Sequence, residues 1–211
     1  IVAVGGGLAY GNLGYSHHAV QDYAFMRVMP NMTILAPGDP SETKMCLDFI
    51  VENSGPSYFR LGKTGEMNYN KSTSLRGNGA LETLFLSNGA KFAIISTGAI
   101  LQSVQQMVSD NNISEVDLYT CPIWGMHLKN SLQERLRQYS KIVVVEDHLE
   151  DGGFGSWVLE ALEPEERSKI RIFGLNPEVC GMVGSQKHLN HEGGLNYCLL
   201  YTSPSPRDVE E

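Results

Sequence analysis

Residues 14–42, GYSHHAVQDYAFMRVMPNMTILAPGDPSE, hold the pattern that decides the fold class. Apolar residues recur there at helical spacing after a serine that is a suitable N-cap, so we expect a helix over residues 16–27. A Pro-Asn pair ends this helix, and the apolar run at residues 32–36 predicts a buried strand. A Pro-Gly-Asp-Pro turn then leads into a second helix, which is capped by Asp39 or Ser41.

The segments on both sides of this stretch extend the same alternation. Residues 1–4 and 57–61 are expected to be strands, so the order is β-α-β-α-β, which favours a parallel sheet covered by helices. After residue 79 the alternation resumes. Strands are expected at residues 81–86, 91–96, 115–120, 141–146 and 169–173, and helices at 99–109, 130–138 and 153–162. The predicted fold class is α/β, with two consecutive open, mostly parallel sheets flanked by helices.

Changes in composition predict where the chain is divided. Residues 1–63 form the first unit, and the polar, glycine-containing residues 64–79 are expected to be a linker. Residues 80–196 form the second unit. Residues 197–211 end in SPSPRDVEE after an abrupt change in composition, and we expect them to be a non-native tail whose removal costs no stability.

Composition excludes several classes of function. The 211-residue chain has a formal net charge of −8, which disfavours a general nucleic-acid or acidic-membrane surface but is compatible with a local anion site. No apolar run is long enough to span a membrane. The four cysteines have no CxxC spacing, which argues against a zinc site and fits a reduced, cytoplasmic protein. Because the chain opens inside a strand-like run, we expect a fragment of a longer protein.

Four side chains are the main candidates for chemistry. His17 and His18 would lie in the first turn of the helix expected at residues 16–27, where the helix dipole favours neutral imidazole. The alternative is one buried structural histidine and one exposed histidine. Arg60 and Lys63 follow the strand at residues 57–61, at the sheet edge where an anion would bind. The alternative for both cations is a surface salt bridge.

Two glycine-containing segments have weaker signals. Gly5-Gly6-Gly7 lacks the GxGxxG spacing, so no dinucleotide site is inferred. Residues 146–156, EDHLEDGGFGS, run from a strand into a helix, and their glycines suit close helix–sheet packing, a subunit interface or an anion. His148 in this segment is expected to be a supporting or interface residue rather than a catalyst.

These segments together resemble the transketolase family. The resemblance is carried by residues 14–32, by Pro37, Asp39 and Glu42, by GPSYFR at residues 55–60, and by VVVEDHLEDGGFGS at residues 143–156. It implies a thiamine diphosphate and Mg²⁺ enzyme with three α/β domains, of which this chain holds the end of the pyrimidine-binding domain and most of the C-terminal domain. The diphosphate-binding domain and the glutamate that activates the cofactor are absent, so no cofactor-binding residue and no metal ligand is assigned here.

The resemblance also implies roles for single residues. His17 matches a histidine that hydrogen-bonds a substrate oxygen, and His18 matches a position that is His or Gln in relatives. Arg60 matches a phosphate-binding arginine, and Lys63 stands where a second arginine is common. Leu13 stands where the family often has an aspartate that contacts the sugar, so a classical sugar phosphate substrate does not follow.

Three functions follow from these observations. The first is a fragment of a transketolase-like transferase that moves a two-carbon ketol unit between sugars or sugar phosphates and is inactive alone. It would work as a homodimer or with an N-terminal diphosphate-binding subunit. The second is another thiamine diphosphate enzyme, either a deoxyxylulose phosphate synthase or a 2-oxo acid decarboxylating subunit. The third is a non-catalytic assembly subunit.

Overall fold

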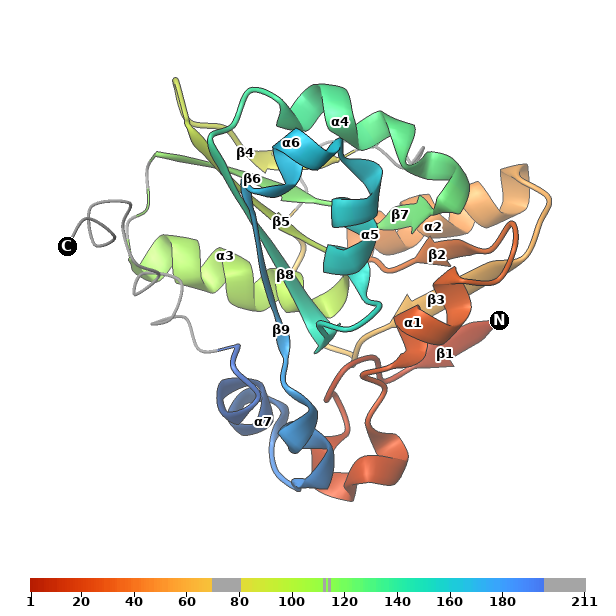
Figure 1. Ribbon diagram of the computed structural model, residues 1–211. Coiled ribbons are helices and arrows are strands. Elements are labelled where there is room, and N and C mark those ends of the chain that lie inside the picture. The colour runs from red at the N-terminus through yellow and green to blue at the C-terminus, as the bar shows by residue number, and fades with distance from the viewer. Residues whose placement is uncertain (70–80, 112, 114, 196–211) are drawn as a thin grey trace.

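The computed structural model describes residues 1–69, 81–111, 113 and 115–195, which form two open sheets between helices (Figure 1). Across the first sheet the order is β1 (Val2–Val4), β3 (Ser57–Leu61), β2 (Thr33–Leu35) and β7 (Ile123–Gly125). The strands β1, β3 and β2 are parallel, and β7 is antiparallel to β2. The outer strand β1 exposes Val2 and Val4, and Ile1 before it is exposed as well.

The second sheet has five strands. Its order is β4 (Glu82–Phe85), β6 (Val116–Thr120), β5 (Phe92–Ser96), β8 (Lys141–Leu149) and β9 (Ile170–Leu175). The strand β4 is antiparallel to β6, and the other neighbours are parallel. The predicted α/β class with two open, mostly parallel sheets is confirmed.

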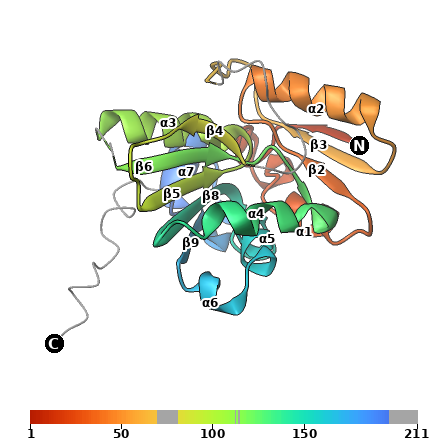
Figure 2. The same ribbon diagram turned by 90° about the horizontal axis from the view of Figure 1, so that it is seen from above.

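Helices cover both faces of the two sheets. They are α1 (Asp22–Arg27), α2 (Pro40–Glu52), α3 (Leu101–Asp110), α4 (Asn130–Leu136), α5 (Phe154–Ala161), α6 (Pro164–Arg167) and α7 (Gln186–Glu192). Figure 2 shows α2 and α3 on one side of the sheets and α4, α5 and α6 on the other. No helix in the described part of the chain combines the length and apolar character needed to cross a bilayer.

One apolar cluster joins the two sheets. One of its two tryptophans, Trp124 of β7, is fully buried and packs against Tyr23 of α1 and Trp157 of α5, with ring centroids 5.2 and 5.5 Å apart. The Trp124 indole N–H also donates to the Thr97 hydroxyl at 3.1 Å. Smaller clusters lie under α2 and under α3. The two sheets therefore share a core on the α4–α5 side.

The helix α2 begins as its capping pattern predicted, and the structure decides between the two caps. The Asp39 carboxylate accepts the Glu42 backbone N–H at 2.8 Å, and the Glu42 carboxylate accepts the Gly38 N–H at 2.7 Å. The Asp39 carboxylate thus satisfies a first-turn N–H that the helix leaves without a partner, and the Glu42 carboxylate binds the backbone of the residue before the cap.

The helix expected at residues 16–27 is wrong in its first half. A 3₁₀ turn spans Tyr15–His17, and α1 begins at Asp22. Ala19 is held in extended conformation because it pairs with Gly7 in an antiparallel bridge. The backbone hydrogen bonds that would continue a helix are therefore used elsewhere, and the helix-dipole argument does not apply to His17 and His18.

Three elements, β7, α6 and α7, were not predicted, and their short length explains why. The strand β7 has three residues, and α7 follows a proline- and glycine-containing segment that obscures helical spacing. The pairing of β7 with β2 means that residues 80–196 supply a strand to the first sheet. The division of the chain at residues 63, 79 and 196 stays a prediction, and residues 70–80 and 196–211 lie outside the described part.

Candidate functional site

Arg60 of β3 lies where the carboxyl ends of β1 and β3 meet the strand β8 of the second sheet. The side chain is buried, with 3% of the residue exposed. Its Nε donates to Asp22 Oδ2 at 2.7 Å, and its Nη1 donates to Tyr23 Oη at 2.9 Å and to Asp147 Oδ1 at 2.6 Å. Its Nη2 donates to the backbone carbonyls of Ala19 at 2.7 Å and Asp147 at 3.2 Å.

These contacts occupy all five N–H donors of the guanidinium, because Nε has one and each Nη has two. The guanidinium also lies over the Tyr23 ring, 4.2 Å from its centroid. A phosphate group could reach Arg60 only by displacing one of these acceptors. The alternative to an anion site was a surface salt bridge, but the salt bridges of Arg60 are buried. Phosphate binding by Arg60 stays a prediction.

The charges around Arg60 do not balance. Two carboxylates, Asp22 and Asp147, pair with one guanidinium. Burial lowers the pKa of Arg60, but the carboxylates outweigh burial and hold it above its ordinary value. Burial raises the pKa of Asp147, while Arg60 opposes the rise. Asp147 Oδ2 is buried and has no hydrogen-bond partner among the described residues.

The glycine-rich loop after β1 packs directly on this ion pair. A Cβ at Gly6 would lie 2.7 Å from Arg60 Nε. At Gly7, where φ is 64°, a Cβ would collide with the Asp147 carboxylate. The glycines therefore serve close packing against the Arg60–Asp147 pair, which agrees with the absence of a dinucleotide motif.

The two histidines lie on the loop that precedes α1. His17 is exposed, and its Nδ1 is 2.9 Å from the Ser16 hydroxyl. His18 is half-buried, packs edge-on against Tyr15, and has no described hydrogen-bond partner at either buried ring nitrogen. Because His18 precedes Ala19, the Arg60–Ala19 hydrogen bond places it next to the Arg60 cluster. The alternative to a functional pair was one buried structural histidine and one exposed histidine. The structure comes near that alternative, because His17 is exposed and His18 is half-buried.

Lys63 is the exposed cation of the predicted set. It follows β3 by two residues, and its Nζ lies 6.0 Å from the centroid of the Tyr10 ring. It is thus on the loops that leave the carboxyl ends of β1 and β3, as its position in the sequence predicted. Of the two predicted anion-binding cations, Lys63 is the one whose charge faces solvent.

The segment EDH in β8 supports the site from the second sheet. The Glu146 carboxylate accepts the N–H groups of Phe154 at 2.6 Å and Gly155 at 2.9 Å, at the start of α5. Burial raises the pKa of Glu146 to about 8, although these two hydrogen bonds act in the opposite direction. A Cβ at Gly155 would lie 2.6 Å from Ile172, so the expected close helix–sheet packing is confirmed.

His148 is a buried, neutral residue of the same segment. Its Nδ1 lies 2.6 Å from the Leu149 carbonyl, and its Nε2 is 3.4 Å from the Ala24 N–H. This pattern assigns the proton to Nδ1, because Nε2 must accept. Burial lowers the pKa of His148 to about 4, and the ring stacks on Tyr23 with centroids 5.1 Å apart. His148 therefore supports the Arg60 cluster through Tyr23, in keeping with its predicted supporting role.

Sequence reasoning named Arg60 and the EDH segment but missed Asp22, Tyr23 and Asp147 as direct partners. Asp22 and Asp147 are 38 and 87 residues away from Arg60 in sequence. Both lie inside the motifs quoted above. A buried arginine at a strand end needs carboxylate partners, and this signal could have directed attention to acidic residues in those motifs.

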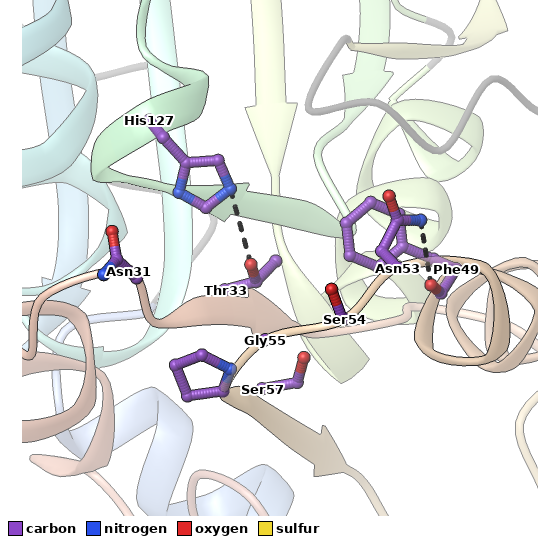
Figure 3. Close-up of a pocket in the computed structure, with 9 residues that line it drawn as sticks. Asn31, Thr33, Phe49, Asn53, Ser54, Gly55, Ser57 and His127 are labelled. Atoms are coloured by element: carbon purple, nitrogen blue, oxygen red, sulfur yellow. Dashed lines mark hydrogen bonds between the residues drawn. The ribbon is translucent and has the colours of Figure 1, made fainter.

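A separate pocket of about 310 Å³ lies near the opposite, amino ends of β2 and β3. Its lining is mostly polar and includes Asn31, Thr33, Asn53, Ser57 and His127. Figure 3 shows the His127 ring directed toward Thr33, whose hydroxyl is 3.5 Å from Nε2. None of the predicted site residues lines this pocket.

The described residues do not fit a resident diphosphate with its metal. Nowhere in the described ranges do three or more His, Cys, Asp or Glu side chains gather as a metal site would require. The buried cation Arg60 is already paired with two carboxylates. A diphosphate and its Mg²⁺ would therefore need ligands from outside these residues.

Comparisons with known proteins identify the family. Residues 1–66 match the family model "Transketolase, pyrimidine binding domain". One subunit of the apulose-4-phosphate transketolase of Phocaeicola vulgatus is 29% identical over 197 residues, which cover 92% of this chain and 62% of that protein. The 1-deoxy-D-xylulose-5-phosphate synthase of Clostridium perfringens is 32% identical over 175 residues, which cover 79% of this chain and 27% of the synthase.

Solved structures agree in fold. A structure titled "Split gene transketolase, inactive beta4 tetramer" superposes with a TM-score of 0.75 at 24% identity, covering 94% of this chain and 63% of that one. A transketolase from Pichia stipitis superposes with a TM-score of 0.74 at 18% identity, covering 95% and 29%. This chain thus spans about three fifths of the Phocaeicola protein and about a quarter of the synthase. By motifs, family model and relatives together, the chain belongs to the transketolase family.

Proposed function

We propose that this chain is one section of a thiamine diphosphate-dependent, transketolase-like transferase that moves a two-carbon ketol unit between sugars or sugar phosphates. The observation that carries the proposal is the loop with His17 and His18, which is bridged through Ala19 to Gly7 at the carboxyl end of β1. Exposed Lys63 follows the carboxyl end of the neighbouring strand β3. Similarity to a transketolase subunit over 92% of the chain supports it. The section would be inactive alone and would work with a diphosphate-binding part, fused or separate, or as a homodimer.

The proposed roles follow from exposure. His17 hydrogen-bonds a substrate hydroxyl or carbonyl oxygen, and its imidazole is free to exchange a proton with it. His18 contributes a second polar contact through its unpartnered ring nitrogens. Lys63 supplies positive charge to an anionic substrate, while Arg60, whose donors are occupied, holds the loop. Thiamine diphosphate with Mg²⁺ would supply the carbanion chemistry from the diphosphate-binding part.

The test uses the complete enzyme, in which this chain is combined with its diphosphate-binding part. Ketol transfer is measured with a panel of sugar and sugar phosphate donors. Substitution His17→Ala is expected to lower kcat at least tenfold while leaving cofactor binding unchanged, and Lys63→Ala is expected to raise KM for phosphorylated donors more than for free sugars. Full activity of His17→Ala with every donor would refute the role of His17.

A deoxyxylulose phosphate synthase is the second candidate, because one relative with that name covers 79% of this chain. Pyruvate consumption with an aldehyde acceptor separates it from ketol transfer. Pyruvate decarboxylation without such an acceptor would indicate a 2-oxo acid decarboxylating subunit. If the diphosphate-binding part were fully active without this chain, the non-catalytic assembly role would replace all three.

A further inference from the structure

The backbone that follows His18 is attached at three points. Ala19 and Gly7 exchange two hydrogen bonds, each with the N–H of one residue donating to the carbonyl of the other at 2.9 Å. Arg60 Nη2 donates to the Ala19 carbonyl at 2.7 Å. The Leu149 N–H donates to the Val20 carbonyl at 2.9 Å. The position of the His17–His18 pair is therefore tied to the Arg60 guanidinium and to β8.

Asp147 determines how that guanidinium is turned. Its carboxylate accepts from Nη1 at 2.6 Å, and its backbone carbonyl accepts from Nη2 at 3.2 Å. Nη2 is the same group that donates to Ala19. Because the guanidinium is planar and rigid, fixing Nη1 also fixes the direction in which Nη2 points.

Asp147 is also in contact with the loop's other anchor. The carboxylate lies so close to Gly7 that a Cβ there would collide with it, and Gly7 is the bridging partner of Ala19. One buried carboxylate of the second sheet thus reaches the histidine loop by two routes, through Arg60 and through Gly7.

We propose that Asp147 is a positioning residue for His17 and His18: through Arg60 it holds the Ala19 backbone, and so sets where the two imidazoles stand at the sheet edge. The effect on turnover rests on the proposed function. The effect on the loop does not, because it concerns the contacts within this chain.

Glu160 provides a matched control. Its carboxylate accepts from Arg27 at 2.7 and 3.1 Å and from Lys129 at 2.6 Å, so it also ties α1 to the second sheet's helices. These contacts are at the far end of α1 from the histidine loop. Asp147 pairs with Arg60 of β3, and Glu160 pairs with Arg27 of α1, so each carboxylate joins the second half of the chain to the first. Substitutions Asp147→Asn and Glu160→Gln each remove one such carboxylate with little change in side-chain volume.

The first experiment uses the full chain and records the ring ¹⁵N and ¹H NMR signals of His17 and His18. Asp147→Asn is expected to shift both histidines and to speed amide exchange at Gly7 and Ala19 at least tenfold, whereas Glu160→Gln leaves both unchanged. In an Arg60→Lys background the effect of Asp147→Asn is expected to shrink, because the two residues act in one path. Unchanged histidine signals in Asp147→Asn, or equal shifts in Glu160→Gln, would overturn the proposal.

A measurement on the unsubstituted chain covers the case in which Asp147→Asn does not fold. The Gly7, Ala19 and Leu149 amides, which attach the loop to its anchors, are expected to exchange slowly and with similar rates. Exchange of Gly7 and Ala19 at the rate of an unprotected amide would mean that the loop is not held, and the proposal would fail.

The activity experiment separates this proposal from the proposed function. In the complete enzyme, Asp147→Asn is expected to reduce kcat/KM at least tenfold through both a higher KM and a lower kcat, with Glu160→Gln close to the unsubstituted enzyme. If the unsubstituted enzyme has no ketol-transfer or pyruvate activity, the proposed function fails and the NMR result alone decides the positioning role. If Asp147→Asn is fully active, the positioning role fails and the proposed function stands.

Discussion

At Arg60, five donors of one side chain meet five acceptors from four residues, so every N–H of a charge that is costly to bury has an acceptor. Breaking such a pair by removing one partner typically costs about 3–5 kcal/mol, because a buried charge is left uncompensated. Here the charges left behind would be two carboxylates. The residue therefore matters to stability as well as to the site.

Substitution Arg60→Met is expected to lower the free energy of unfolding by about 3–5 kcal/mol. The loss is expected to grow as the pH rises, because burial already raises the pKa of Asp147, and without the opposing cation this side chain would fold more readily as a protonated acid. Urea denaturation at several pH values measures both effects. Lys44→Met removes the exposed pair with Asp48 and should cost less than about 1 kcal/mol; an equal loss in the two variants would contradict the buried network.

The buried carboxyl group of Glu146 is expected to make the free energy of unfolding depend on pH. Its pKa is raised from the ordinary 4.5 to about 8 by burial, so the folded state keeps a proton that the unfolded state has released. The stability due to this proton is complete below pH 4.5 and is lost as the pH rises to about 8. His148, with its pKa lowered to about 4 from 6.5, costs stability as the pH falls below 6.5.

Between pH 6.5 and 8 the effect of Glu146 can therefore be observed apart from that of His148. The free energy of unfolding is expected to fall with a slope of up to about 1.4 kcal/mol per pH unit, and Glu146→Gln is expected to flatten this slope. Glu134→Gln, at an exposed position of α4, serves as the control. A slope that persists in Glu146→Gln would assign the pH dependence to another group.

The position of Arg60 near a strand end could be predicted, because a Gly-Pro pair precedes the short run at residues 57–61 and Gly62 follows it. Its partners could not be predicted from local pattern, because hydrogen bonds over 38 and 87 residues leave no periodic signal. The same reason explains the error at residues 16–21. Local spacing favoured a helix there, but pairing of Ala19 with Gly7 and Arg60 gives the backbone other partners.

At the scale of the element, α2 was predicted well because its signals are local. Asp39, Pro40 and Glu42 provide the cap, the first-turn proline and the returning carboxylate within four residues. The strand β7 is the opposite case. With three residues, it forms because β2 offers an edge, and its own sequence does not indicate that pairing.

Substitution Asp39→Ala is expected to destabilise the chain by about 1–2 kcal/mol, because the Glu42 N–H loses its acceptor. The Tyr69 N–H, which donates to the other carboxylate oxygen at 3.0 Å, loses a partner as well. Thermal unfolding followed by circular dichroism measures the loss. Glu52→Ala, at an exposed position in the last turn of the same helix, should change stability by less than about 0.5 kcal/mol, so comparable losses would argue against capping by Asp39.

For the whole molecule, the shared core and the β2–β7 pairing make the two sheets one cooperative structure. We expect a single unfolding transition. The two tryptophans, Trp124 and Trp157, report on the joint core, and far-UV circular dichroism reports on all helices and strands. The two denaturation curves are expected to coincide, and separate midpoints would show that the sheets unfold independently.

The free edge of β1 has a consequence for the chain in solution. No described strand pairs with the outer side of β1, and Ile1, Val2 and Val4 are each more than 60% exposed there. An open, β-branched edge is a template onto which any extended polypeptide can add by backbone hydrogen bonding. Purified alone, the chain is therefore expected to self-associate through this border of the sheet as its concentration rises.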